Sequence, residues 1–292
     1  MSTGPTVSIL IRTIGRESLA RAIVSALAQS HRPLEIVIVN AGSPSLLPMP
    51  DAGDVSVRIV ECPGSSRPRA ANVALDNARG DWLVFLDDDD SFAPDHVASL
   101  LEAATESGAG VAYSATLCVD DAGDGNIVLG AAFDRVHLFR GNYLQIGAAL
   151  FRASLRDSAR FDETLLCLQD WDFWIQAAQV THFAYTGKPT NLWRAYTGSS
   201  GAGLGANQRA EVTDPFREQI RRKWMGTAAV LRGKIKYHQD AAQSAAARGN
   251  LQSAERHAAA AIRLTRGPLE QEAPRALANT STPSGDGKEI AQ

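Results

Sequence analysis

Four consecutive carboxylates, Asp87–Asp90, directly follow the apolar run 82–86 and are the residues of this sequence best suited to chemistry. Adjacent negative charges repel one another, so a bound cation would remove a cost that folding alone does not explain. Carboxylate oxygens are ligands of Mg²⁺ and Mn²⁺, which usually share them with substrate phosphates. Alternation along an extended segment predicts that Asp87 and Asp89 face one way and Asp88 the other. A solvated acidic loop is the alternative interpretation, and the four residues alone do not decide between the two.

The elements around this cluster predict an α/β fold. Apolar β-rich runs at 7–11, 34–39, 57–60 and 82–86 indicate buried strands, and segments of helical periodicity lie between them, one from Ser18 and one over 70–78. This alternation is typical of a parallel sheet covered by helices. Ligands bind such sheets at the carboxyl ends of the strands. Arg12-Thr13, the segment 40–43 and Asp87–Asp90 would therefore meet at one rim, which favours a binding site.

The second half of the chain has a different character. Another helix is expected over 94–105, a strand over 111–119 and a helix over 171–178. Residues 211–224 are charged and helical in pattern, and the Ala-rich stretch 237–265, broken at 248–250, predicts two antiparallel helices. From Gly267 onward Pro, Gly, Ser and Thr accumulate, so roughly the last twenty residues are expected to be disordered.

Composition bounds the class of protein. The chain has 292 residues, 45% of them hydrophobic and 21% charged, and a net charge of −3, which gives no reason to expect nucleic acid or an anionic membrane as the partner. Cys62, Cys118 and Cys167 lack any metal-ligand spacing and are expected to be free thiols. A basic region followed by an apolar segment is missing from the N-terminal stretch, and no apolar run approaches the length of a membrane span. We therefore expect a cytoplasmic protein.

Four motifs in a fixed order resemble those of the family 2 glycosyltransferases of the GT-A fold, which are inverting, metal-dependent enzymes that use nucleotide sugars. The motifs are VSILIRT at 7–13, ALAQSHRPLEIVIVNAGS at 26–43, RAANVALDNARGDWLVFLDDDDSFAPD at 69–95 and FDETLLCLQDWDFWI at 161–175. The resemblance spans about residues 5–200. It implies a Rossmann-like, mostly parallel sheet covered by helices within a glycosyltransferase domain over 1–210.

The same resemblance implies a division of labour along the chain. Residues 5–118 would bind the nucleotide sugar and 119–210 the acceptor. A C-terminal helical extension would follow over 211–266, and then a disordered tail over 267–292.

The resemblance assigns roles to individual residues for the nucleotide and the metal. Asp89 is the expected ligand of a Mn²⁺ or Mg²⁺ ion, and Asp87 or Asp88 would contact that ion or the ribose. The other residues implied to contact the nucleotide diphosphate are Arg12, Thr13, Asn40, Arg67 or Arg69, and Arg194. The family's second strand usually ends Asp-Asp-Gly-Ser, whereas this one ends Asn40-Ala41-Gly42-Ser43, so a carboxylate that commonly contacts the base is absent.

Asp170 matches the second residue of the family's Glu-Asp motif, which is assigned as the general base, and the Glu is replaced by Gln169. The alternative role for Asp170 is to cap the helix that follows, because Asp favours that position. Asp172 is expected to be solvated, and Trp171 and Trp174 to belong to the core.

The expected function is transfer of a sugar from a nucleotide-diphosphate sugar, UDP-sugar being favoured, to a glycan or small-molecule acceptor. Cell-surface or polysaccharide synthesis, a location at the inner face of the membrane and a homodimer formed through the C-terminal helices are further expectations. A non-catalytic sugar-nucleotide-binding or scaffold domain is the main alternative, given Asn40-Ala41 and Gln169. A haloacid-dehalogenase-like phosphatase is a lesser one, because Asp87-Asp88-Asp89-Asp90-Ser91 fits the start of that motif; there, however, the motif lies on the first strand.

Overall fold

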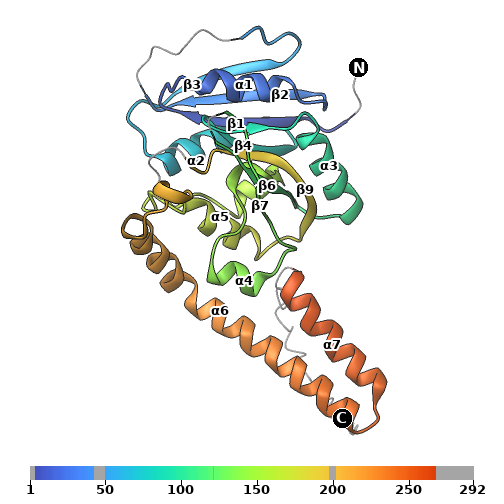
Figure 1. The fold of residues 1–292 in the computed structure, drawn as a ribbon. Coiled ribbons are helices and arrows are strands. Elements are labelled where there is room, and N and C mark those ends of the chain that lie inside the picture. Colours follow the sequence, from blue (N-terminus) through green and yellow to red (C-terminus); the bar gives the residue numbers. More distant parts are fainter. Residues whose placement is uncertain (1–3, 43–49, 121, 197–201, 268–292) are drawn as a thin grey trace, which may run out of the picture.

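A computed structural model of the chain describes residues 4–42, 50–120, 122–196 and 202–267 (Figure 1). Its strands form one mixed sheet in the order β3-β2-β1-β4-β8-β6-β9-β5, with β7 paired to β6. The strands are β1 (Val7–Thr13), β2 (Leu34–Asn40), β3 (Ser56–Glu61), β4 (Trp82–Asp87), β5 (Ser91–Phe92), β6 (Val111–Cys118), β7 (Ile127–Leu129), β8 (Ala149–Arg152) and β9 (Phe183–Trp193). The α-helices are α1 (Leu19–Leu27), α2 (Arg67–Asn77), α3 (His96–Ser107), α4 (Arg135–Arg140), α5 (Gln169–Ala177), α6 (Ala210–Ala247) and α7 (Leu251–Arg266).

The first four strands are parallel, as the alternation of apolar runs and helices predicts. β1 lies between β2 and β4, with Thr13 opposite Asn40 and Arg12 opposite Asp87. The carboxyl ends of these strands therefore share one rim of the sheet. The predicted meeting of Arg12-Thr13, the end of β2 and the carboxylate cluster is confirmed.

The rest of the sheet is mixed. β8 is antiparallel to both β4 and β6, whereas β9 runs parallel to β6 and antiparallel to β5. The turn between β6 and β7 joins an antiparallel pair. The two halves of the sheet thus differ in strand direction, and β4 is where they meet.

Alternating side chains of the central strands serve two cores, one on each face of the sheet. Ile9 belongs to a cluster that contains the inner faces of α1 and α3, and Leu10 to a cluster that contains α2 and α5. Trp171 and Trp174 are fully buried in the second cluster, as predicted. Helices on both faces explain why β1, β2 and β4 have uninterrupted apolar sequences.

Two helix predictions need correction. The helix expected over 70–78 begins at Arg67, because Pro68 suits a first helical turn. In the C-terminal region one helix of 38 residues, α6, also includes residues 225–236, for which the sequence predicted no element. Leu231 and Ile235, one helical turn apart, are buried there, so packing continues the helix through two glycines. The predicted break at 248–250 is confirmed between α6 and α7.

Several further expectations concern the ends and loops. The three cysteines are free, as predicted. The predicted disordered tail lies, from 268 onward, outside the described residues. Among the helices that the structure describes, none combines the length and apolar content needed to cross a membrane.

Ile38 and Ile59 provide a matched test of the core, because they are paired across β2 and β3. Ile38 is fully buried and Ile59 is 43% exposed. We predict that Ile38→Ala lowers the free energy of unfolding by about 2–5 kcal/mol and Ile59→Ala by about 1 kcal/mol or less. Urea denaturation measures both; equal losses would contradict the described burial.

Candidate active site

The carboxylate cluster begins where β4 ends, at Asp87. Its carboxylate forms an ion pair with the guanidinium of Arg12, a buried residue of β1. That guanidinium lies 5.3 Å from the centre of the Phe85 ring. Arg12 and Asp87 are opposite each other in the sheet, so this pair follows from strand register. It joins two strand ends at the rim.

Asp88 and Asp89 lie in the turn that follows β4 and share one cation. Asp88 accepts hydrogen bonds from Thr13 Oγ1 at 2.7 Å and from Arg16 Nη1 at 2.9 Å. The same Arg16 nitrogen lies 3.2 Å from Asp89. The prediction that Asp88 faces away from Asp89 is wrong, because the strand ends at Asp87 and its alternation ends with it.

Asp90 is buried and has a structural role. It accepts a hydrogen bond of 2.9 Å from the backbone N–H of Arg194, the residue that follows β9. The guanidinium of Arg194 in turn donates to the backbone carbonyl of Asp120. The carboxylate cluster therefore also positions the end of β9.

The members of the cluster differ in their affinity for protons. Burial alone would raise the pKa of Asp87, but the guanidinium groups of Arg12, Arg67 and Arg16 lower it below its ordinary value. Burial, and then the charges of Asp87 and Asp88, raise the pKa of Asp89. Negative charge is thus well compensated at Asp87 and poorly compensated at Asp89, which unlike buried Asp90 lines a cavity where a further cation could bind.

Two adjoining cavities open beside the cluster. The first, of about 260 Å³ and here termed the strand-end cavity, lies over the ends of β1, β2 and β4. The second, of about 430 Å³ and termed the α5 cavity, lies over the N-terminus of α5. Arg67, Asp87 and Trp193 line both. A ligand that fills the two cavities would therefore pass Asp87.

Asp170 lines the α5 cavity from the first turn of α5. Its carboxylate accepts a hydrogen bond of 2.8 Å from Asn142 Nδ2. Burial, reinforced by the charge of Asp87, raises the pKa of Asp170 despite the hydrogen bonds that lower it. The alternative role as helix cap is wrong, because the cap position is Leu168, in a left-handed conformation with φ 59°. Asp170 is a partly exposed carboxylate of enhanced basicity facing a cavity.

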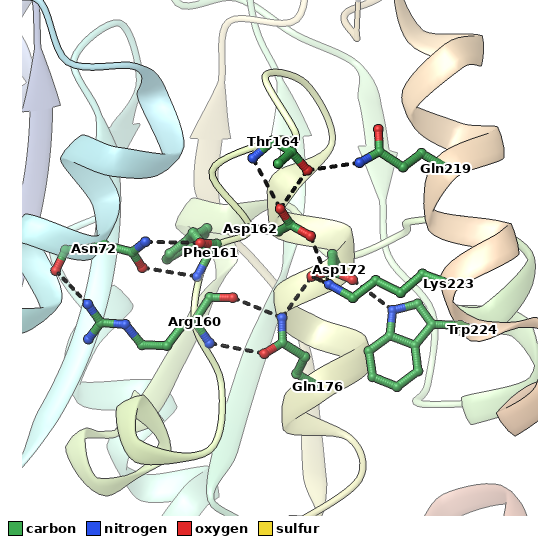
Figure 2. Close-up of polar contacts among 10 residues, drawn as sticks. All are labelled: Asn72, Arg160, Phe161, Asp162, Thr164, Asp172, Gln176, Gln219, Lys223 and Trp224. Atoms are coloured by element: carbon green, nitrogen blue, oxygen red, sulfur yellow. Dashed lines mark hydrogen bonds and ion pairs between the residues drawn. The ribbon is translucent and has the colours of Figure 1, made fainter.

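Asp172, expected to be solvated, is fully buried, and this prediction is wrong. Its carboxylate accepts hydrogen bonds from Lys223 Nζ at 2.9 Å, Trp224 Nε1 at 2.7 Å and Gln176 Nε2 at 2.7 Å (Figure 2). Lys223 also pairs with Asp162 at 3.0 Å. Two of these donors lie on α6, so the buried carboxylate joins α6 to α5 two residues from Asp170.

Most of the predicted site residues lie on the two cavities. Asp170 lines the α5 cavity, and the strand-end cavity is lined by Arg12, Thr13, Arg67, Asp87, Asp88, Asp89 and Arg194. Two predicted residues lie elsewhere. Asn40 is buried, accepts from Gly42 N–H and donates to Glu61, whereas Arg69 pairs with Glu163 at 3.7 Å.

The structure adds lining residues that the sequence did not single out. Arg16 and Ser65 line the strand-end cavity, and the Ser65 hydroxyl is buried without a hydrogen-bond partner among the described residues. Asp214 and Arg217, from the first turns of α6, line the α5 cavity. Both residues fall in the helical extension predicted over 211–266, outside the predicted glycosyltransferase domain, so they were not expected to be site residues. The Ser65-Ser66-Arg67-Pro68 pattern could have indicated that a helix starts at Arg67, because Pro suits the first helical turn. Ser65 and Arg67 would then have been expected beside the N-terminus of that helix.

Gln169 is a further lining residue of the α5 cavity. It is buried, and its Oε1 atom has no hydrogen-bond partner within the described part of the chain. A buried acceptor of this kind is costly unless a ligand or water completes it. The neutral amide beside Asp170 is therefore suited to accept a hydrogen bond from a hydroxyl group.

Comparison with known proteins agrees with this geometry. The model of the family described as "Glycosyl transferase family 2" matches residues 8–147, which contain β1, β2, β4 and the whole carboxylate cluster. Residues 8–147, just under half of the chain, are therefore similar to glycosyl transferase family 2. The match ends before α5, so Asp170 lies outside it.

Two bacterial proteins are similar to parts of this chain. The succinoglycan biosynthesis protein ExoO of Rhizobium meliloti is 35% identical over 99 residues, which are 33% of this chain and 28% of ExoO. The uncharacterized glycosyltransferase YwdF of Bacillus subtilis is 26% identical over 185 residues, 59% of this chain and 68% of YwdF. The chain thus spans little more than a quarter of ExoO.

A solved structure is similar in fold over a larger share of the chain than the family model matches. S. aureus TarS 1-349 in complex with UDP-GlcNAc matches with a TM-score of 0.56 and 16% identity, over 75% of this chain and 71% of that one. At this identity the likeness concerns the fold alone. It confirms the predicted α/β fold.

The buried contact between α5 and α6 gives a test with an internal control. Lys223→Met should lower the free energy of unfolding by about 1–3 kcal/mol, less than for a fully buried pair because Lys223 is 39% exposed. Lys236→Met, which removes an exposed pair with Asp240 on the same helix, should cost about 0.5 kcal/mol or less. Thermal and urea unfolding compare the two; an equal effect would show that the Asp172 contact adds nothing.

Proposed function

We propose that this chain is an inverting glycosyltransferase that moves a sugar from a nucleotide-diphosphate sugar to an acceptor hydroxyl. The observation that carries the proposal is the pair of cavities that meet at Asp87, with the carboxylate cluster on one and Asp170 on the other. A donor in the strand-end cavity would direct its sugar toward the α5 cavity. The acceptor would then approach from the side of Asp170.

The strand-end cavity has the groups that a nucleotide diphosphate requires. Arg67 begins α2 and lines the strand-end cavity, so its guanidinium and the positive end of that helix both lie beside the cavity. This arrangement suits phosphate oxygens. The unpartnered Ser65 hydroxyl and the end of β1 lie on the same cavity. UDP-sugars are the favoured donors, in keeping with the UDP-GlcNAc bound by TarS.

A divalent ion fits the chemistry of the cluster. Carboxylate oxygens are suitable ligands for Mg²⁺ and Mn²⁺, and Asp89 lines the strand-end cavity with a charge that its neighbours compensate poorly. In the described chain no three His, Cys, Asp or Glu side chains are grouped to hold an ion. An ion held by Asp89 and Asp87 would therefore take its other ligands from the donor phosphates and water, as Mg²⁺ commonly does. Its contribution would be to stabilise negative charge on the leaving phosphate.

The proton transfer falls to Asp170. The acceptor oxygen forms a bond to the anomeric carbon while the bond from that carbon to the donor phosphate breaks. The hydroxyl proton passes to the Asp170 carboxylate, and the nucleoside diphosphate leaves. Attack on the face opposite the leaving group inverts the configuration. Asn142 orients the carboxylate, and Gln169 Oε1 is placed to accept from an acceptor or sugar hydroxyl.

Of the two alternative functions, one has support in the structure and the other has none. A sugar-nucleotide-binding domain without activity is the second candidate, supported by Gln169 in place of a Glu and by Asn40, which is occupied by contacts within the chain. A phosphatase of the haloacid-dehalogenase type is not supported. Its motif requires the first strand, whereas Asp87 ends the fourth strand in chain order, inside the segment that the family 2 model matches.

The wider setting is also a proposal. The name of ExoO supports a role in polysaccharide or cell-surface glycan synthesis with a glycan or small-molecule acceptor. We place the reaction in the cytoplasm, at the inner face of the membrane. A homodimer through α6 and α7 remains a prediction.

Asp170→Asn removes the base and keeps the shape of the side chain. Transfer should fall by about 10²–10⁴-fold, whereas UDP binding measured by calorimetry stays unchanged. Asp95→Asn, on an exposed residue away from both cavities, is the control. Near-normal transfer by Asp170→Asn would refute the assignment, and normal UDP binding without transfer by the wild type would favour the non-catalytic alternative.

The pH dependence follows from the raised pKa of Asp170. The base acts when ionised, so kcat/KM should fall as the pH decreases through that pKa, at a higher pH than for an ordinary aspartate of pKa 3.8. Asn142→Ala removes a donor that favours the ionised form, so its acidic limb should lie at still higher pH. An unchanged limb would contradict the role of Asn142.

Asp89→Ala tests the metal assignment. UDP binding in the presence of Mn²⁺ should weaken by at least about tenfold, whereas UDP binding without metal should change little. Asp95→Ala is the matched control. Equal dependence of Asp89→Ala and wild type on Mn²⁺ would place the ion elsewhere.

A further inference from the structure

Charge is segregated along this chain to a degree that the net value of −3 conceals. Residues 221–266, here termed the basic hairpin, comprise most of α6 and all of α7. They contain ten Lys and Arg and two Asp and Glu, a net charge of +8. Residues 1–220 contain seventeen basic and twenty-six acidic residues, a net charge of −9. Figure 1 shows the hairpin extending away from the sheet as two antiparallel helices.

The positive charge of the hairpin is presented to solvent. Arg232, Lys234, Arg256, Arg263 and Arg266 are all exposed. Within the described chain, the ion pairs of the hairpin involve other residues: Lys223 pairs with Asp162 and Asp172, and Arg222 and Lys236 pair with acidic residues on their own helix. The five exposed cations are therefore available for an external anion.

Large apolar side chains stand among these cations. Met225 is 66% exposed, Tyr237 65%, Leu251 68% and Ile262 57%. The hairpin has its own internal contacts through other side chains, including the buried Leu231 and Ile235 of α6 and Ala261 of α7. Leu251 and Ile262 lie eleven residues apart on α7, close to three helical turns, so they share one side of that helix. The exposed apolar side chains are thus not among those that pack in the interior of the hairpin.

We propose that the basic hairpin binds the surface of an anionic phospholipid bilayer. Lys and Arg side chains would contact lipid phosphates, while Leu251, Ile262, Met225 and Tyr237 enter the interfacial region to a shallow depth, as in helices that lie on membranes. The acidic remainder of the chain is repelled by the same surface. This opposition makes the hairpin the point of contact and keeps both cavities away from the lipid charge.

The combination of charge and apolar exposure favours a bilayer over other anions. An acidic polysaccharide would use the cations but gain nothing from exposed Leu251 and Ile262. A second copy of the chain would offer an acidic surface, and would give a dimer whose stability falls with salt. A bilayer would contact both the cations and the exposed apolar side chains. Such binding would hold the protein at the inner face of the membrane, whatever the chemistry at Asp170.

The test is sedimentation of the full chain with vesicles of phosphatidylcholine alone or with 30% phosphatidylglycerol added, at fixed ionic strength. The protein should bind the anionic vesicles and not the neutral ones. Arg232→Gln/Lys234→Gln/Arg263→Gln should weaken that binding by at least about tenfold. The matched control Arg79→Gln/Arg140→Gln/Lys188→Gln removes three exposed cations outside the hairpin and should leave it unchanged or slightly stronger.

A second pair of variants separates the bilayer from soluble polyanions. Leu251→Asn/Ile262→Asn should weaken vesicle binding and leave retention on a heparin column unchanged. Circular dichroism and the rate of donor hydrolysis in vesicle-free buffer confirm that each variant is folded and report separately on the proposed enzyme. Equal binding to neutral and anionic vesicles, no binding to either, or equal loss in the two triple variants would overturn the proposal. Salt-sensitive dimers in sedimentation velocity, without vesicle binding, would assign the hairpin to a second copy instead.

Discussion

The concentration of negative charge at the carboxyl end of β4 is the constraint on which the rest of the site depends. Four carboxylates stand in succession at the rim of a buried sheet, and the chain compensates each of them differently. Arg12 pairs with Asp87, Thr13 and Arg16 bind Asp88, and the backbone N–H of Arg194, just after β9, binds Asp90. Because these partners come from β1, the loop after it and the end of β9, neutralising the cluster also assembles the walls of the strand-end cavity. Asp89 is poorly compensated and lines the strand-end cavity, where an ion bound together with the donor diphosphate would add positive charge.

A second buried carboxylate joins the catalytic half to the C-terminal helices. Asp172 lies on the same helix as Asp170 and takes two of its three partners from α6, 51 and 52 residues further along the chain. Burying this carboxylate without those partners would be costly, so the contact holds α5 and α6 against each other. The first turns of α6 then complete the α5 cavity with Asp214 and Arg217. The helix that begins as a wall of the site continues outward as the basic hairpin, and one element therefore serves the acceptor side and the proposed membrane contact.

Sequence patterns predicted the parts of this structure that depend on neighbours in the chain. Apolar runs located β1, β2 and β4, and the parallel connection of short strands and helices placed Arg12, Thr13 and the carboxylates at one rim. Asp172 could not be predicted in the same way, because its burial depends on Lys223 and Trp224, and nothing in its local sequence indicates them. The continuity of α6 was not predicted either, because Gly226 and Gly233 weaken the helical pattern of the local sequence. The burial of Leu231 and Ile235 outweighs that weakness in the structure. The family resemblance implied that Asn40 contacts the nucleotide, whereas its amide donates to Glu61 and accepts from the backbone N–H of Gly42.

The central claim is that one donor sugar lies between the carboxylate cluster and Asp170. A crystal structure of the Asp170→Asn variant with UDP-sugar and Mn²⁺ tests it most directly. We expect the diphosphate beside Arg67 and Asp89 in the strand-end cavity, with the anomeric carbon facing the residue at 170 across the α5 cavity. A donor bound outside the strand-end cavity, or one whose anomeric carbon faces away from that residue, would contradict it.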